Sequence, residues 1–166
     1  IESIGVIGTG VQARMQVSHL SGITDCKNIK VWGRSDKSTE QYIEDMNQDG
    51  WNVRKVESTC EIAESCDLII TATPSKKPLL KKESLKKGTH ITALGSDSPG
   101  KQELEHDIFT KADLIVADSK LQCLERGEIH HAIKHGIIEE DDVQELGSLI
   151  SANEPIYRDE DQITIA

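Results

Sequence analysis

Short apolar runs recur along the first two thirds of the chain and are separated by amphipathic stretches. The runs are predicted to be strands and lie at residues 4–7, 29–32, 53–56, 68–72, 90–94 and 114–117. The stretches between them include predicted helices at residues 11–20, around Tyr42, Ile43 and Met46, and around Ile62. Buried strands that alternate with helices are typical of parallel sheets. We therefore expect an α/β fold of the Rossmann type: a doubly wound, mostly parallel sheet of about six strands with helices on both faces.

The pattern changes after Asp118. Residues 121–133 are predicted to be helical. Residues 138–161 hold nine acidic residues and one Arg, with Pro155 as a break, and are predicted to form a helical surface segment. A final strand is expected at residues 162–165, and because it stops abruptly at Ala166 we expect the native protein to continue. Without an internal repeat or linker, residues 1–166 are interpreted as one domain excised from a larger protein.

The composition argues against several kinds of partner. A net charge of -10 argues against nucleic acid as a partner, because binding a polyanion needs a basic face. No apolar run reaches the roughly 20 residues of a membrane span, and no secretory signal is evident, so we expect a cytoplasmic protein with no membrane partner. The four scattered cysteines are interpreted as free thiols.

The strongest local motif is G-x-G-x-x-A, placed directly between the first strand and the first helix. The first glycine permits a tight turn, the second lets backbone approach a pyrophosphate, and the alanine lets helix and strand pack closely. The helix N-terminus offers free N–H groups to phosphates. We therefore expect a dinucleotide to contact Gly8, Thr9, Gly10, Val11, Gln12 and Ala13.

The end of the second strand distinguishes the two nicotinamide dinucleotides. NAD sites usually have an Asp or Glu there, whereas this chain has Gly33, Arg34 and Ser35. Gly33 leaves room, and Arg34 can pair with a 2′-phosphate. These residues favour NADP(H) as cofactor. NAD(H) stays open, because Arg34 is also readable as an ordinary exposed loop residue and Asp36 is close enough to be the acid.

Two further loops follow strands at the carboxyl edge of the expected sheet, where doubly wound folds bind ligands. Thr71, Ala72 and Thr73 are small enough for the chain to pass close to a cofactor, and Gly95 is assigned to the same site. Asp97 is the only acid placed where the nicotinamide should lie. Ser98 and Pro99 are also readable as a helix N-cap and first-turn proline, so from the residues alone Asp97 is either catalytic or a support for that turn.

Two other clusters are given no role in binding. His131 and His135 have the i, i+4 spacing of ligands on one helix face, but no carboxylate or Cys completes a site, so no metal is expected. Six lysines between Lys76 and Lys87 are interpreted as a solvated surface.

Four segments together resemble the ornithine cyclodeaminase/mu-crystallin family. They are residues 4–13 (IGVIGTGVQA), 71–73 (TAT), 95–104 (GSDSPGKQEL) and 159–165 (DEDQITI). They span nearly the whole chain in the expected order, and the Gly-x-Asp-x-Pro-Gly-Lys stretch is far more specific than the glycine loop.

The resemblance implies a two-domain enzyme, homodimeric at full length, in which a dinucleotide domain is inserted into a substrate domain built from both chain ends. The substrate would be a small amino acid. In the reaction that the resemblance implies, ornithine is converted to proline and ammonia by internal hydride exchange, and Asp97 lies at the reacting amine or water. The basic residues that hold the substrate carboxylate in that family lie upstream of this segment, so this chain alone is expected to be inactive.

Arg34 departs from the cyclodeaminase pattern, which tends to have an Asp near that strand end. It is more similar to the NADP(H)-using relatives. Two alternatives therefore stay open: an NADPH-dependent imine or keto-acid reductase or amino-acid dehydrogenase, and a non-catalytic NADPH-binding protein like mu-crystallin.

Overall fold

The computed structural model describes residues 1–152 and 157–166. All strands of the described chain join one sheet, in the order β3-β2-β1-β4-β5-β8-β6-β7, and every neighbouring pair is parallel. The strands are β1 (Ile4–Ile7), β2 (Asn28–Trp32), β3 (Asn52–Lys55), β4 (Leu68–Thr71), β5 (His90–Ala93), β6 (Leu114–Ala117), β7 (Val143–Glu145) and β8 (Thr164–Ile165). The strand order reverses beside β1, which leads outward to β2 and β3 on one side and to β4 and β5 on the other. This is the doubly wound Rossmann-type sheet that the sequence predicts.

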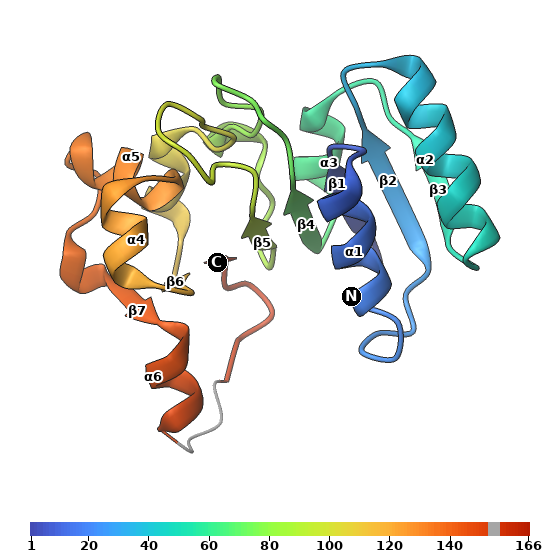
Figure 1. Cartoon of the computed structure of the whole chain (residues 1–166). Coiled ribbons are helices and arrows are strands. Elements are labelled where there is room, and N and C mark those ends of the chain that lie inside the picture. Colours follow the sequence, from blue (N-terminus) through green and yellow to red (C-terminus); the bar gives the residue numbers. More distant parts are fainter. Residues whose placement is uncertain (153–156) are drawn as a thin grey trace.

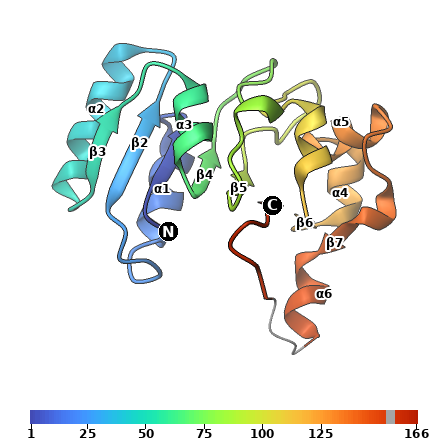
Figure 2. The same cartoon turned by 180° about the vertical axis from the view of Figure 1, so that it is seen from behind.

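The helices cover both faces of the sheet. The α-helices are α1 (Val11–His19), α2 (Asp36–Gln48), α3 (Thr59–Ser65), α4 (Lys120–Glu125), α5 (Glu128–Lys134) and α6 (Leu146–Ser151). The 3-10 turns are η1 (Lys82–Ser84), η2 (His106–Lys111) and η3 (Glu140–Asp142). In Figure 1, α1 lies in front of the sheet, whereas α3 lies in front in the reverse view of Figure 2.

Two buried clusters correspond to these two layers. One contains Ala13 and Val17 of α1 together with Tyr42 and Met46 of α2. The other contains residues of α3, η2 and α5. The strands supply both clusters alternately, because successive side chains point to opposite faces of a sheet. Ile4 and Val6 of β1 therefore join the first cluster, and Ile7 joins the second.

The second half of the chain corrects three sequence predictions. The segment at residues 138–161, expected to be helical, contains α6 but also β7. With β7 and the expected final strand, the sheet has eight strands rather than about six. Only Val143 of β7 is buried, and such a short edge strand leaves no periodic apolar pattern in the sequence. The expected break at Pro155 lies outside the described residues.

The helix predicted at residues 121–133 is two helices, because the chain leaves helical geometry between α4 and α5. Arg126 is extended there, and Gly127 has a φ of +89° that favours glycine. The final strand is also shorter than expected. It is inserted between β5 and β6, so the C-terminus lies in the middle of the sheet (Figures 1 and 2).

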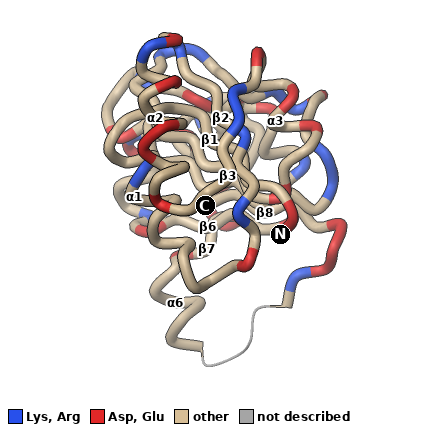
Figure 3. The backbone as a smooth tube through the Cα atoms, turned by 90° about the vertical axis from the view of Figure 1, so that its right-hand side faces the viewer, with Lys and Arg blue, Asp and Glu red and all other residues tan. Residues whose placement is uncertain are grey.

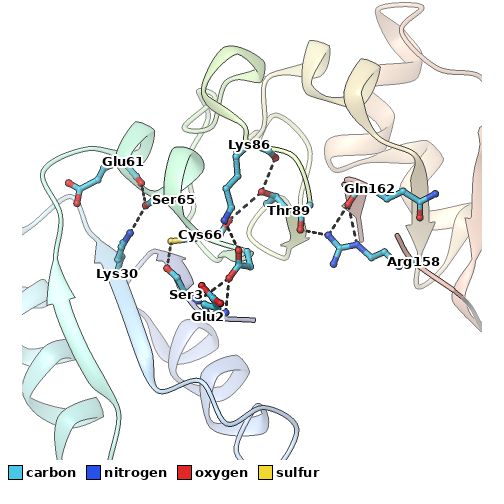
Figure 4. A network of polar contacts seen from close by, with 12 residues as sticks. Glu2, Ser3, Lys30, Glu61, Ser65, Cys66, Lys86, Thr89, Arg158 and Gln162 are labelled. Atoms are coloured by element: carbon cyan, nitrogen blue, oxygen red, sulfur yellow. Dashed lines mark hydrogen bonds and ion pairs between the residues drawn. The ribbon is translucent and has the colours of Figure 1, made fainter. Parts of the chain in front are cut away.

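The amino edge of the sheet is held by a polar network, shown in Figure 4. Asp67, just before β4, accepts hydrogen bonds from the N–H groups of Glu2 and Ser3 at 2.7 and 3.1 Å and pairs with the ammonium of Lys86 at 2.5 Å. Arg158 donates to the carbonyls of Gly88 and Gln162. These bonds fix the starts of β1, β4, β5 and β8 and leave the opposite edge for a binding site.

The surface carries mixed charge. Asp and Glu positions are spread along the chain, with short Lys and Arg stretches between them (Figure 3). Two of the lysines of residues 76–87 form ion pairs: Lys86 with Asp67 and Lys87 with Asp161. No helix among the described residues is long and apolar enough to cross a membrane.

Candidate functional site: the carboxyl edge of the sheet

The glycine loop lies between β1 and α1, next to the point where the strand order reverses. Gly8 has a φ of +115°, and a Cβ there would come within 2.5 Å of the Ala72 carbonyl oxygen. Only glycine therefore allows the loop to pass so close to the chain after β4. Gly10 caps α1 in an extended conformation, and a Cβ there would meet no atom within 4 Å. The first-turn N–H groups of α1 have no side-chain cap, so they are available to an anion.

A cavity of about 240 Å³ opens above this loop. The loops after β1, β2 and β4 line it, so it lies across the crevice where doubly wound sheets bind ligands. Its lining residues are Gly8, Thr9, Gly10, Trp32, Gly33, Arg34, Ser35, Ser38, Ala72, Thr73, Pro74, Ser75 and Leu79. We call this cavity the switch-point pocket.

Arg34 supplies the positive charge at the β2 end of the switch-point pocket. It is exposed, and its guanidinium makes no hydrogen bond or ion pair with any residue that the structure describes. Gly33 has no room for a side chain, because a Cβ would lie 2.5 Å from the Thr39 hydroxyl and 2.8 Å from the Thr9 methyl group. The nearby acid, Asp36, is occupied by an ion pair with Lys55 at 2.9 Å and does not line the pocket.

Arg14 braces the glycine loop from below. Its guanidinium donates to the carbonyls of Thr9 and Gly10, forms an ion pair with Asp45 at 2.8 Å, and lies 4.9 Å above the centre of the Tyr42 ring. The hydrogen bond from Arg14 lowers the pKa of Asp45. The loop is therefore held in shape by contacts on its protein side, while its other side faces the switch-point pocket.

Asp97 lies outside the switch-point pocket, in a second cavity of about 410 Å³. Its carboxylate is 70% exposed and 2.6 Å from the Lys101 ammonium. The hydrogen bonds from Lys101 and Ser98 lower the pKa of Asp97, so the group is a carboxylate at neutral pH. No helix begins at Ser98 or Pro99: residues 98–100 form a turn, so the alternative reading of Ser98 as a helix N-cap does not hold. The cavity is also lined by the ends of β5, β6 and β8 and by Arg126 and Glu128.

Two buried carboxyl groups lie close to the second cavity, and one of them, Glu128, lines it. Glu103 is fully buried and accepts hydrogen bonds from the Thr71 hydroxyl at 2.7 Å and from the N–H groups of Thr73 and Gly95 at 2.6 and 2.8 Å. Glu128 accepts from the N–H groups of Glu103 and Leu104 at 2.6 and 3.0 Å. Burial raises the pKa of Glu103 and raises the pKa of Glu128 to about 7.

The residues predicted from sequence are thus divided between three places. Eight of them line the switch-point pocket, and Asp97 lines the second cavity. Val11, Gln12, Ala13, Thr71 and Gly95 do not line the switch-point pocket. Ala13 is buried against the sheet, and Thr71 and Gly95 contact Glu103. Glu103 was not predicted from the sequence, because an acid among polar residues usually lies on the surface.

The histidines of α5 are used locally. The rings of His130 and His131 hydrogen-bond to the carbonyls of Leu124 and Lys101 at 2.8 and 2.9 Å. His135 stacks on His106 with ring centres 4.0 Å apart. Among the described residues, no group of three or more His, Cys, Asp or Glu side chains is arranged to hold a metal ion.

The strand order, the glycine loop and the pocket at the switch point define this chain as a Rossmann-type domain of the dinucleotide-binding class. The model of the ornithine cyclodeaminase/mu-crystallin family matches residues 2–166, and the chain belongs to that family.

The relatives cover several activities. The chain is 35% identical to alanine dehydrogenase of Archaeoglobus fulgidus over 97% of its own length and 49% of the relative's. It is 32% identical to iminosuccinate reductase of Paracoccus denitrificans over 98% of its own length and 50% of the relative's. Among solved structures, it matches Δ1-pyrroline-2-carboxylate reductase of Thermococcus litoralis in complex with NADH and L-proline, with a TM-score of 0.91 and 29% identity over 99% of this chain and 51% of that one. An archaeal alanine dehydrogenase dimer with bound NAD matches with a TM-score of 0.89 and 34% identity over 99% of this chain and 51% of that one. The chain therefore spans about half the length of the relatives it matches.

Proposed function

We propose that this chain is the nicotinamide-dinucleotide-binding domain of a two-domain enzyme and that it takes NADP(H) in preference to NAD(H). The observation that carries the proposal is the combination of Gly10 and Arg34 in one pocket. Gly10 leaves open space in front of uncapped helix N–H groups, and Arg34 presents a cation without a partner among the described residues at the β2 end. These features fit a pyrophosphate and a 2′-phosphate, respectively.

The geometry supports a division of roles between the two ends of the pocket. Residues 8–10 and the start of α1 would bind the pyrophosphate, and Arg34 with Ser35 would bind the adenosine end. The other end of the dinucleotide would then extend toward the loops after β4 and β5, because β2 and β4 flank β1 on opposite sides. When bound, the nicotinamide ring supplies a hydride acceptor or donor. Asp97, in the loop after β5, would hold or accept a proton at the reacting amine or water.

For the whole enzyme we propose chemistry at the α-carbon of a small amino acid, with ornithine cyclodeamination to proline and ammonia as the leading reaction. An NADPH-dependent imine or keto-acid reductase is the second candidate, favoured by Arg34 and by the reductases among the relatives. Steady-state consumption of NADPH distinguishes the two, because a cyclodeaminase regenerates its cofactor in each cycle. A non-catalytic NADPH-binding protein would show no turnover with either kind of substrate.

The rest of the enzyme would supply the cation that holds the substrate carboxylate and would form a homodimer. An alanine dehydrogenase among the structural relatives is a dimer. Several large apolar side chains are exposed on this chain, among them Val11 and Met15 on α1, Leu121 on α4 and Ile150 on α6. These are the surfaces that we expect the missing part of the protein to cover.

Gly10→Ala tests the site because it separates binding from folding. The added methyl group meets no protein atom within 4 Å, so the melting temperature should stay close to that of the wild type. The same methyl group would occupy the space of the pyrophosphate, so NADPH affinity should fall at least about tenfold, or ~1.4 kcal/mol. Fluorescence titration of NADPH measures this loss.

Gly147→Ala on α6 is the matched control, since a Cβ there also meets nothing within 4 Å but lies far from the switch-point pocket. It should bind NADPH like the wild type. Unchanged NADPH affinity in Gly10→Ala would contradict the placement of the pyrophosphate on this loop.

A further inference from the structure

Glu103 is a buried acid for which the proposed function has no use so far. Its side chain is fully buried, and no Lys or Arg among the described residues forms an ion pair with it. A buried carboxyl group without a cation is costly to a fold, and it is tolerated here because its oxygens accept three hydrogen bonds. Where those three donors lie indicates what the group does.

The donors belong to two loops that are separate in sequence. Thr71 ends β4 and Thr73 lies just after it, whereas Gly95 lies just after β5. One oxygen of Glu103 accepts from both Thr71 and Gly95, and the other accepts from Thr73. The carboxylate therefore bridges the loop that lines the switch-point pocket and the loop that leads into Asp97.

The two loops are as close as backbone allows. A Cβ on Gly95 would lie 2.2 Å from the Thr73 carbonyl oxygen and 2.5 Å from the Glu103 carboxyl group. Glycine at position 95 thus permits the approach, and Glu103 holds it. This explains why Gly95 matters to the site although it does not line the switch-point pocket.

Glu103 is itself fixed from both sides. Its carbonyl accepts from the N–H groups of Leu79 and Leu80 at 2.6 and 3.1 Å, which ties it to the chain after β4. Its N–H donates to the Glu128 carboxylate at the start of α5. The segment is therefore rigid, and a rigid support is what a reacting geometry requires.

We propose that Glu103 is a positioning residue that sets the distance between the nicotinamide half of the bound dinucleotide and Asp97. The inference rests on the proposed function, in which the adenosine half lies at β2 and the nicotinamide half lies toward β4 and β5. It assigns Glu103 to the nicotinamide half, because its three donors lie at and after the ends of β4 and β5, whereas Gly10 and Arg34 follow β1 and β2.

The test compares two ligands: NADPH, and 2′-phospho-ADP-ribose, which is the same molecule without its nicotinamide ring. Glu103→Gln keeps the length of the side chain but replaces one acceptor oxygen by an NH₂ group, which faces a backbone N–H. NADPH affinity should fall about tenfold, the size of one lost hydrogen bond to a charged group. Affinity for 2′-phospho-ADP-ribose should stay within about twofold, because the Glu103 carboxyl group bonds to Thr71, Thr73 and Gly95 and to neither the glycine loop nor Arg34.

Glu105→Gln is the matched control two residues away, and both ligands should bind to it as to the wild type. If Glu103→Gln does not fold, Thr71→Val removes a single donor to the same carboxylate while keeping the volume of the strand residue. It should show the same selective loss at smaller size.

The outcomes distinguish the role of Glu103 from the proposed function. Equal losses for both ligands, or no loss for either, in a folded variant would overturn the role of Glu103. A wild-type chain that binds neither ligand would instead overturn the proposed function and this inference with it.

Discussion

Replacing Asp97 by asparagine is expected to lower the turnover of the proposed two-domain enzyme by about 100-fold or more while leaving NADPH affinity nearly unchanged. Asparagine has the same shape but cannot accept a proton. The loss should fall on kcat because Asp97 does not line the switch-point pocket, so cofactor binding does not depend on its charge. Steady-state kinetics with small amino acids and imines, together with an NADPH titration, measure both quantities.

Asp25→Asn is the control, since Asp25 is an exposed acid that lines neither cavity. It should leave turnover at the wild-type value. Turnover of Asp97→Asn within a few-fold of the wild type would remove Asp97 from the mechanism.

Replacing Arg34 by alanine is expected to cost about 1 to 3 kcal/mol of NADPH binding, the range for hydrogen bonds to charged groups. NADH has no 2′-phosphate, so its affinity should change much less. Because Asp36 is paired with Lys55, none of the described residues places a free carboxylate at the β2 end of the pocket to repel the phosphate or to hold the ribose of NADH. Calorimetric titration of both dinucleotides gives the two affinities.

Arg54→Ala controls for the loss of an arginine. Arg54 lies on the outer strand β3, pairs with Glu61 of α3 and does not line the pocket. Equal wild-type affinities for the two dinucleotides, or a preference for NADH, would be incompatible with the assignment of NADP(H).

The central strands β1 and β4 were predictable because they are buried on both faces. Runs such as residues 4–7 and 68–71 are entirely buried, so they stand out in the sequence as unbroken apolar stretches. The glycine loop was predictable for a different reason, since its chemistry is local to six residues. β7 was not predictable, because one buried valine followed by Gln and Glu has no apolar periodicity.

The site was predictable only where it depends on strand ends. Topology brings the ends of β1, β2 and β4 together, and the sequence motifs at those ends therefore meet in one pocket. Glu103 could not be predicted, because its role depends on three hydrogen-bond donors from two loops. Its sequence neighbours do not indicate that the side chain is buried. Thr71 and Gly95 were found, but their direct contact is with Glu103.

The central claim is that these 166 residues contain the whole dinucleotide site but not the whole substrate site. The most direct test is calorimetric titration of the purified chain with NADPH, followed by an ammonia assay with ornithine. The account predicts saturable binding at one site per chain, tighter for NADPH than for NADH, and no ammonia release. Absence of saturable binding for either dinucleotide would contradict the dinucleotide site, and appreciable ammonia release by the chain alone would contradict the division of the enzyme.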